Sequence, residues 1–537
     1  MNGLMMNTPL LIKNIALHAE RLHGDAEIVS ILADGKKHRY TFRESMARAK
    51  RLSSALATLG ISRLGRVGTL AWNSYKHLEL YYGVSCSERI LHTINPRLFS
   101  QQLDYIINHA EDEIIFFERM FLTLVKEMAP NCPKVRYFVC LDDLQEEESE
   151  FLNVLVYEDL IKKNVEAVWD DCDEQTASSL CYTSGTTGNP KGVLYSHRST
   201  VLHSYAVCLP DSAGLSAVDS VLTVVPMFHV NAWGYPYAGL MAGSKLVFPG
   251  HLLGDPATLV DLIESESVTI AGGVPTVWHG LLSYLRDNNL KLSSLDRTII
   301  GGSACPPAMI KEFKEVHDVR VLHGWGMTEM SPIGVINQDK PKTKYLTGQE
   351  YLTQASKQGR PIPGVEVKII DDNGDELAWN GKEVGKLMVR GPWVCRSYYK
   401  DDSVEENFRE GWFDTGDIAS IDNQGFVLIT DRAKDVIKSG GEWISSIELE
   451  NIANSHPAVE HCAVIGMYHP KWEERPLLIV VSKQESLKNC KQDLIDWYEG
   501  KVAKWWIPDE VIFVDELPLT ATGKVSKLTL RLKYSKT

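Results

Sequence analysis

The chain lacks several patterns that mark common protein classes. Its 10 cysteines include no Cys-x-x-Cys pair and no His/Cys metal spacing, so we expect reduced thiols in a cytoplasmic protein. No tract of clustered Lys and Arg is present, and the formal net charge is -14. Because binding to a phosphate backbone needs such clusters, a nucleic-acid partner is not expected.

Long apolar runs are also missing. The most apolar region, residues 221–249, is broken by prolines, Asn231, Gly234 and His229, which excludes a membrane-spanning helix and argues against stable membrane insertion. Residues 1–15 have no long apolar core and no small-residue cleavage site, so they do not read as a signal peptide. With 537 residues, 44% of them hydrophobic, the chain can bury large cores in about two to four domains or subdomains.

Helical and strand-like patterns alternate along the first part of the chain. Thr41 and Glu44 form a capping-box pattern before an amphipathic helix that we expect to end near Gly60. The patterns predict helices near 11–22, 41–59, 77–84 and from 100, and strands near 66–72, 114–117, 136–141, 179–182 and 298–300. This alternation predicts α/β layers with parallel strands.

From Gly359 onward the pattern changes to short strands joined by tight turns. Residues 371–374 and 422–425 are turn sequences between apolar runs, so we expect a small antiparallel β subdomain over about 345–430. Beyond it, the pattern predicts a helix near 445–455, strands near 459–467 and 477–482, a helix near 488–501 and a closing loop over 513–527.

The most distinctive stretch, residues 182–192, reads Tyr-Thr-Ser-Gly-Thr-Thr-Gly-Asn-Pro-Lys-Gly. It follows a predicted strand, at the end where α/β sheets bind ligands. Glycines let successive amides face one anion, and Lys191 supplies a point charge, so the stretch predicts a phosphate-binding loop. It is not a Walker loop, because Pro190 precedes the lysine and Gly192 follows it. A flexible polar surface loop is the alternative.

This stretch resembles the phosphate-binding loop of the AMP-forming acyl-CoA synthetases, the adenylate-forming superfamily that includes firefly luciferase and peptide-synthetase adenylation domains. Further motifs in the family's order extend the resemblance over nearly the whole chain. It implies a large N-terminal AMP-binding domain, residues 1–431, with two α/β layered subdomains and a small β-barrel subdomain at 345–430. A small mobile α+β C-terminal domain, residues 432–537, would pivot at a hinge in 431–435.

The resemblance implies ATP, CoA and Mg²⁺ as ligands. Glu329, in the Gly-Trp-Gly-Met-Thr-Glu run from 324, would hold Mg²⁺ together with Ser184, although such a Glu can simply favour a helix start. Trp325 stands where tyrosine is usual and still offers a stacking surface for adenine. The implied ATP- or AMP-binding residues are Thr183, Ser184, Gly185, Thr186, Thr187, Gly188, Lys191, Gly302, Ser303, Ala304, Trp325, Gly326, Met327, Thr328, Asp417 (to the ribose) and Arg432.

The family's catalytic lysine matches Lys524, which follows Gly523 in the closing loop and would lie between the carboxylate and the α-phosphate. By default a lysine in such a loop is solvated. The resemblance implies Lys524, Lys438 and His229 as catalytic residues, and His229, Trp233, Gly302 and Gly326 as substrate-binding residues. For CoA and the hinge it implies Lys434, Lys438, Gly440, Gly441 and Trp443. Taken alone, His229 and Trp233 fit packed core side chains equally well.

These residues imply an ATP-dependent acyl-CoA ligase, in which a carboxylic acid becomes an acyl-adenylate and then an acyl-CoA. Several motifs resemble bacterial medium-chain acyl-CoA synthetases and, within those, 3-methylmercaptopropionate–CoA ligases. We therefore rank that thioether acid and short or medium fatty acids first, and a long-chain fatty acid second. Members of the family are often homodimers, so a homodimer is compatible with the resemblance.

Three other interpretations stay open. A loading enzyme for a carrier protein would need a partner, since no carrier segment follows Lys527. A catalytically inactive relative should lack Lys524 or Glu329, and both are present. A luciferase-like oxygenase would keep the same adenylation motifs and is tested by light output with luciferin.

Overall fold

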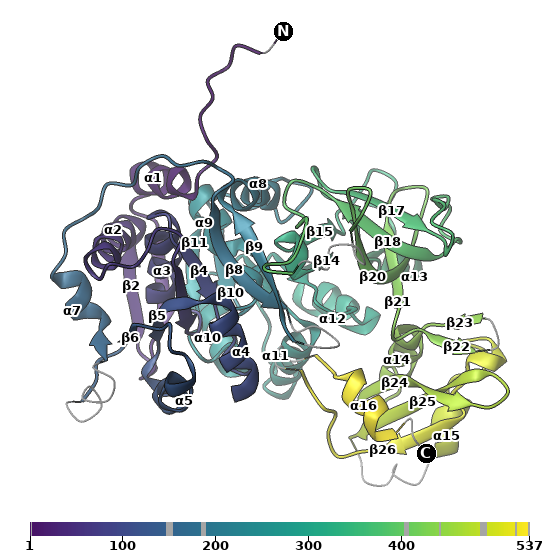
Figure 1. Ribbon diagram of the computed structural model, residues 1–537. Coiled ribbons are helices and arrows are strands. Elements are labelled where there is room, and N and C mark those ends of the chain that lie inside the picture. The colour runs from purple at the N-terminus through teal and green to yellow at the C-terminus, as the bar shows by residue number, and fades with distance from the viewer. Residues whose placement is uncertain are drawn as a thin grey trace.

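The computed structural model describes residues 1, 3–145, 154–183, 189–401, 408–439, 442–483, 491–520 and 524–534, with the backbone alone at 442 and 443. The fold is α/β, with a large N-terminal domain built on several mixed sheets and a small C-terminal domain beside it (Figure 1). Within the described ranges, no helix is both long and apolar enough to cross a membrane.

Buried apolar strands build the first layered half. Its sheet has the order β7 (Leu155–Val156), β6 (Tyr137–Cys140), β5 (Asp112–Phe117), β3 (Arg66–Leu70), β4 (Ile90–Thr93), β8 (Ala177–Thr183) and β9 (Lys191–Ser196). The strands pair in parallel, except that β9 runs antiparallel to β8. Its helices are α2 (Phe42–Thr58), α3 (Tyr75–Ser85), α4 (Ser100–Ala110), α5 (Leu122–Met128) and α7 (Tyr157–Lys162), with the 3-10 turns η1 (Arg119–Phe121) and η2 (Ala129–Asn131).

The predicted capping box opens α2. The Thr41 hydroxyl accepts from the Glu44 N–H, and the Glu44 carboxylate accepts from the Thr41 N–H. A cap of this kind stabilises a helix by about 1 kcal/mol. The helix ends at Thr58, just before Gly60, which takes a positive φ of 67°.

The second layered half carries a longer mixed sheet. Its order is β16 (Arg360–Pro361), β15 (Ile333–Ile336), β14 (Arg320–Gly326), β13 (Arg297–Ile300), β12 (Ile270–Gly273), β10 (Ser220–Thr223), β11 (Lys245–Phe248), β1 (Glu27–Ile31) and β2 (Lys37–Thr41). The strands from β14 to β1 are parallel, so their carboxyl ends lie at one edge. The helices here are α8 (His197–Cys208), α9 (Tyr235–Ala242), α10 (Pro256–Ser265), α11 (Pro275–Asp287), α12 (Pro307–His317) and α13 (Gly348–Ala355), with the 3-10 turns η4 (Val230–Gly234) and η5 (Thr328–Met330).

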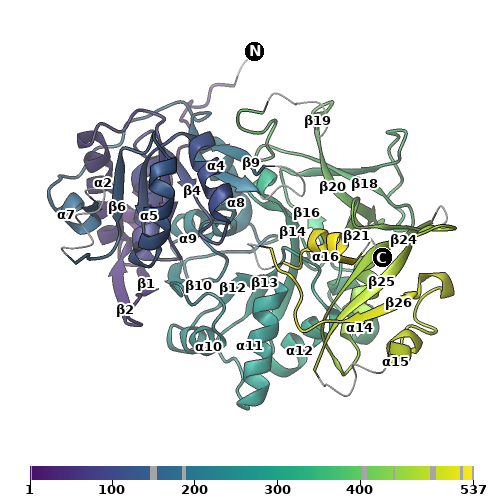
Figure 2. The ribbon, with the colours of Figure 1, turned by 60° about the horizontal axis from the view of Figure 1, so that its bottom comes forward.

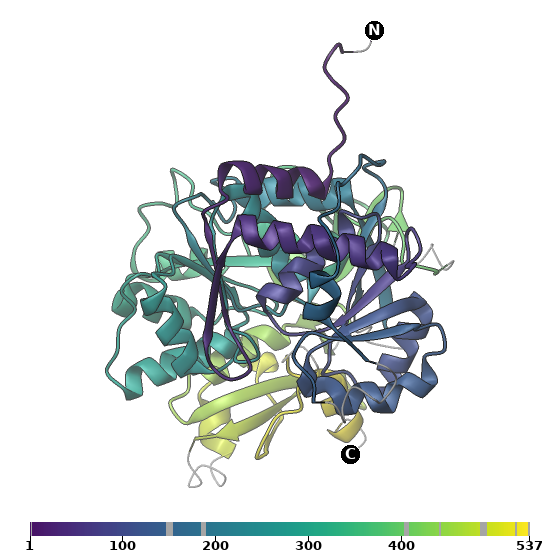
Figure 3. The same ribbon diagram turned by 90° about the vertical axis from the view of Figure 1, so that its left-hand side faces the viewer.

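The two halves share one large apolar core. Helix α1 (Ile12–Leu22) contacts α2 and α3 of the first half and α8 and α9 of the second. Figure 3 shows α1 and α2 lying across both halves. Ile12, Leu52 and Tyr237 are among the buried members of this core, which fixes the two sets of strand ends relative to each other.

The predicted β subdomain is an antiparallel sheet of β17 (Glu366–Ile370), β18 (Gly385–Arg390), β20 (Trp412–Ile421) and β19 (Phe408–Arg409), with β21 (Val427–Arg432) paired to β20. Gly374 and Gly425 have φ of 93° and 84° in the two expected turns, a region that glycine enters without strain. The stretch before Glu366 joins the neighbouring half instead, because β16 pairs with β15.

The C-terminal domain has cores of its own. Its sheet has the order β23 (Glu442–Ile444), β22 (Ile437–Ser439), β25 (Glu473–Ser482) and β24 (Val459–His469), with β26 (Glu510–Phe513) paired to β25. One core includes Leu449 of α14 (Ser446–Asn454) and Leu494 of α15 (Lys491–Asp496); another includes Leu530 of α16 (Lys527–Tyr534). The 3-10 turn η7 (Lys504–Trp506) precedes β26. In Figures 1 and 2 the yellow segment between β26 and α16 extends from this domain toward the large one.

Candidate active site

The predicted phosphate loop connects the antiparallel strands β8 and β9. Thr183 ends β8, Lys191 begins β9, and the two residues are paired across the ladder. The Lys191 ammonium lies 3.3 Å from the Asp401 carboxylate and 4.6 Å from the centre of the Tyr398 ring. Five predicted residues, Ser184, Gly185, Thr186, Thr187 and Gly188, lie outside the described residues. The hairpin therefore places the lysine, while the loop's own contacts stay a prediction.

Gly301 and Gly302 form a glycine turn directly after β13, which matches the strand predicted near 298–300. Gly301 lies against the ring of Trp233: a Cβ there would meet the ring at 3.4 Å and the Gly324 carbonyl at 2.9 Å. Gly302 has φ of +81°, and a Cβ on it would lie 3.5 Å from Lys524 Cε. Ser303 is exposed and Ala304 partly buried in the same turn. A residue of the C-terminal domain thus meets the turn of the large domain.

Lys524 reaches a site rich in charge. Burial lowers its pKa to about 8, Arg432 adds to this effect, and Asp417 and Glu329 oppose it. Burial lowers the pKa of His229 to about 4, and the charge of Lys524 adds to this effect. The structure therefore brings together Lys524, His229 and the three charged residues that the sequence assigned to ATP or Mg²⁺.

Both oxygens of Asp417 are held by neighbouring donors. The Trp325 indole N–H donates to Oδ2 at 2.8 Å, and Arg432 Nε lies 2.8 Å from Oδ1. Burial raises the pKa of Asp417, while Arg432 and Trp325 oppose this effect. The bond from Trp325 is a feature that sequence reasoning missed, since it predicted only a stacking surface at that position. Asp417 lies inside strand β20 and is paired across the ladder with Arg432, the last residue of β21.

Glu329 lies in the short turn η5, immediately after β14. It is 5% exposed, and burial raises its pKa although a hydrogen bond from Tyr398 opposes the shift. That hydroxyl donates to Oε1 at 2.8 Å. No group of three or more His, Cys, Asp or Glu suited to a metal exists in the described part of the chain. Mg²⁺ commonly takes one or two carboxylates plus ATP phosphates, so a single buried carboxylate is compatible with this ion, and Mg²⁺ at Glu329 stays a prediction.

The neighbours of Glu329 are tightly placed by backbone contacts. The Thr328 carbonyl accepts a 2.6 Å hydrogen bond from the buried Tyr195 hydroxyl, and the Met327 N–H donates to the Pro332 carbonyl at 3.1 Å. A Cβ on Gly326 would collide with that same carbonyl. These contacts hold the end of β14 in a fixed position beside the glycine turn.

The predicted acid pocket begins after β10. Residues Val230 to Trp233 of η4 take left-handed φ angles of 40°, 53°, 50° and 56°, which cost roughly 1–2 kcal/mol per residue for L-amino acids. Asn231 offsets this cost by bonding Ser179 at 3.1 Å and Tyr81 at 3.4 Å. The turn brings the ring of Trp233, only 9% exposed, against Gly301. Backbone strain of this kind tends to occur at functional sites.

The residues assigned to the hinge and to CoA lie on the C-terminal domain. Lys434 and Lys438 are exposed, and the Lys438 backbone N–H donates to Glu474 at 2.9 Å. Gly440, Gly441 and the side chain of Trp443 lie outside the described residues. In this conformation the structure thus brings Lys524, and not Lys438, to the glycine turn.

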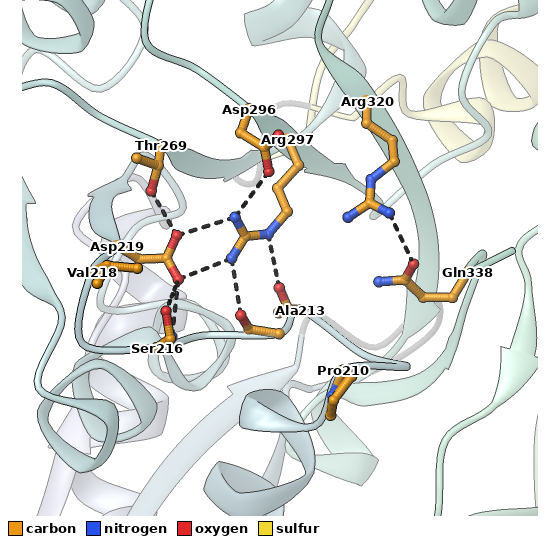
Figure 4. A pocket seen from close by; sticks show the side chains of 11 residues that line it. Pro210, Ala213, Ser216, Val218, Asp219, Thr269, Asp296, Arg297, Arg320 and Gln338 are labelled. Carbon is orange, nitrogen blue, oxygen red and sulfur yellow. Dashed lines mark hydrogen bonds and ion pairs between the residues drawn. The ribbon is translucent and has the colours of Figure 1, made fainter.

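A cavity of about 420 Å³ lies at the amino ends of strands β10, β12, β13 and β14, opposite the candidate active site (Figure 4). Arg297 begins β13 there and bonds Asp219 through both terminal nitrogens, at 3.1 Å each. Its remaining contacts are with Asp296 and with the carbonyls of Ala213 and Gly214. Because protein oxygens accept from all of its donors, we interpret Arg297 as a residue that stabilises the fold by joining the amino ends of these strands.

Comparisons with known proteins identify the family of the chain. The family model described as AMP-binding enzyme matches residues 16–399, and the one described as AMP-binding enzyme C-terminal domain matches residues 448–524. The chain is 51% identical over 536 residues to a 3-methylmercaptopropionyl-CoA ligase of Ruegeria lacuscaerulensis, covering 99% of each. It is 49% identical to a medium-chain-fatty-acid–CoA ligase of Ectopseudomonas oleovorans, covering 99% of this chain and 98% of the relative.

A solved structure extends the likeness to the fold as a whole. An anthranilate CoA ligase in complex with anthranoyl-AMP superposes with a TM-score of 0.85 at 26% identity, covering 98% of both chains. The family models together span the greater part of the large domain and reach Lys524 in the small one. The chain belongs to the family of AMP-binding enzymes.

Proposed function

We propose that the chain is an ATP-dependent, AMP-forming acid–CoA ligase for short- or medium-chain carboxylic acids. In the first half-reaction, a carboxylate oxygen attacks the α-phosphorus of ATP and pyrophosphate leaves. In the second, the thiolate of CoA attacks the acyl carbon and AMP leaves. The observation that carries the proposal is the position of Lys524 at Gly302, where burial and the charges of Arg432, Asp417 and Glu329 act on it.

Charge explains why this arrangement suits the first half-reaction. A carboxylate and a triphosphate repel each other, so the site must neutralise both reactants and the transition state. Lys524 would face the carboxylate and the α-phosphate, and Lys191 the departing pyrophosphate. Mg²⁺, when bound at Glu329, supplies further positive charge to the phosphates. Asp417 would accept from the ribose hydroxyls, with Trp325 beside the adenine.

The second half-reaction needs the small domain in another position. We propose that the domain pivots near Lys434, so that Lys524 leaves and Lys438 with Gly441 faces CoA. The hinge residues Asp431 and Arg432 end strand β21, and the next pairing, β22 with β23, is internal to the small domain. The domain boundary at 431–432, the homodimer and the cytoplasmic location stay predictions.

The substrate proposal rests on the relatives and on the pocket walls. Both relatives named above act, by name, on short or medium acids: 3-methylmercaptopropionate and medium-chain fatty acids. Trp233 lies against Gly301, and Val274 would sit 3.0 Å from a Cβ on Gly302. Bulky groups so close to the turn favour a small acid such as 3-methylmercaptopropionate.

The activity is tested by exchange of labelled pyrophosphate into ATP with a panel of acids and Mg²⁺, followed by CoA-thioester formation. We expect exchange with 3-methylmercaptopropionate and with fatty acids up to medium length. One methylene in an apolar pocket changes kcat/KM by about 10-fold or more, so the length profile should have a clear maximum. A maximum at palmitate would favour the long-chain alternative, and no exchange with any acid would contradict the ligase itself.

A further inference from the structure

Tyr398 occupies a place in the site that the reaction scheme above does not use. It lies on the segment that follows β18, and its hydroxyl donates to Glu329 Oε1 at 2.8 Å. The face of its ring lies under the Lys191 ammonium, 4.6 Å from the ring centre. One side chain therefore contacts both the residue expected to hold Mg²⁺ and the lysine expected to bind phosphates.

The backbone around Tyr398 is held by the same two elements. The Cys395 N–H donates to the Glu329 carbonyl at 2.7 Å, and the Tyr399 N–H donates to the Gly192 carbonyl at 2.8 Å. The segment thus bonds to η5 on one side of Tyr398 and to β9 on the other. Movement of η5 relative to the phosphate hairpin would have to break one of these contacts.

We propose that Tyr398 is a positioning residue that sets the distance and orientation between Glu329 and Lys191 for an ATP–metal complex. The inference rests on the proposed function. Its hydroxyl fixes Oε1 of Glu329 and so sets the orientation in which the carboxylate would meet the cation. Its ring gives the flexible lysine side chain a surface, and a cation over an aromatic face is attracted by the ring's quadrupole.

A packing role is the simpler explanation, because the ring also meets Phe408 with a centroid distance of 6.0 Å. The two roles separate on substitution. Tyr398→Phe keeps the ring contacts with Phe408 and Lys191 but removes the hydroxyl. Tyr398→Leu removes both. Tyr399→Phe is the matched control, because the contact of Tyr399 with β9 is made by its backbone.

The experiment measures ATP affinity by calorimetry, first in EDTA and then across a Mg²⁺ series. Losing an outer contact to a metal ligand weakens metal binding by about 10- to 100-fold. We therefore expect Tyr398→Phe to need about 10-fold more Mg²⁺, with its metal-free ATP affinity unchanged. Tyr398→Leu should also lose about 2- to 5-fold of metal-free ATP affinity through Lys191. Tyr399→Phe should match the wild type in both series.

Pyrophosphate exchange gives the kinetic counterpart. The kcat of Tyr398→Phe should return to within about threefold of wild type at high Mg²⁺, whereas lost packing would lower kcat at every Mg²⁺ concentration and lower Tm. A wild-type Mg²⁺ dependence in Tyr398→Phe would overturn the assignment while leaving the ligase function intact. A wild-type chain that binds no ATP would overturn both.

Discussion

Strands β10, β12, β13 and β14 have buried charged residues at both ends, but the two ends differ in how those charges are balanced. At the amino ends, Arg297 and Asp219 satisfy each other (Figure 4). Although burial acts to raise it, hydrogen bonds from Arg297 and Thr269 hold the pKa of Asp219 below its ordinary value. At the carboxyl ends, burial raises the pKa of Glu329 and lowers that of Lys524.

The difference separates charges that stabilise the fold from charges kept for a ligand. At the amino ends each buried charge meets its own counter-charge, so folding gains from the pairing. At the carboxyl ends the protein holds its ionised groups at a cost, because the shifted pKa values disfavour the charged forms. Shifts of this kind cluster at functional sites. A triphosphate and a carboxylate would supply the counter-charge for Lys524, and a cation such as Mg²⁺ would supply the one for Glu329.

The largest expected effect comes from removing Lys524. We expect Lys524→Ala to slow pyrophosphate exchange by about 10²–10³-fold or more, the scale of one preorganised charge contact. Thioester formation from supplied acyl-adenylate should survive, because the small domain then presents its other face. Lys533→Ala, at an exposed lysine of α16, is the control and should keep wild-type exchange. Similar losses in both half-reactions would contradict the division of labour between Lys524 and Lys438.

The amino ends should respond in the opposite manner. Arg297→Met leaves the buried Asp219 without its ionic partner. Removing one partner of a buried pair lowers the free energy of unfolding by about 3–5 kcal/mol, which is measured as a lower urea midpoint. Arg320→Met is the control. The residue is exposed, and among the described residues its side chain makes one hydrogen bond, 3.5 Å long, to Gln338, so the free energy of unfolding should change by no more than about 0.5 kcal/mol. Exchange by folded Arg297→Met at low temperature should stay near wild type. Lost exchange with unchanged stability would place the cavity in the chemistry.

Local motifs in the sequence were enough to select the charged residues at the carboxyl ends, whose roles stay predictions. Lys524, Glu329 and Asp417 are charged residues in ordered motifs, and the glycines of the turn after β13 have a purely local signature. The contacts of Tyr398 with Glu329 and of Trp325 with Asp417 join residues 69 and 92 positions apart. Contacts of that kind depend on how the β subdomain packs against the large sheet, which residue types alone do not determine.

The fold, like the site, has features that the sequence predicted and features that it did not. The capping box of α2 and the turns at Gly374 and Gly425 follow from local chemistry, and all were predicted. The order of the long sheet was not, since β1 and β2 from the start of the chain pair beside β11. The left-handed run in η4 was also missed, because the buried partners of Asn231, Ser179 and Tyr81, come from distant segments.

The smallest expected effect is the pH dependence of pyrophosphate exchange. It tests the charges at the carboxyl ends of the strands without changing those at the amino ends. With a pKa of about 8, Lys524 carries its charge below pH 8 and loses it above. The kcat/KM of exchange reports the free enzyme, so it should fall toward tenfold per pH unit on the alkaline side. His229 is neutral throughout, since its pKa is about 4. Lys524→Arg should move the alkaline limb to higher pH, because a guanidinium stays protonated, whereas Lys533→Arg should leave it in place; an unmoved limb in Lys524→Arg would assign the titration to another group.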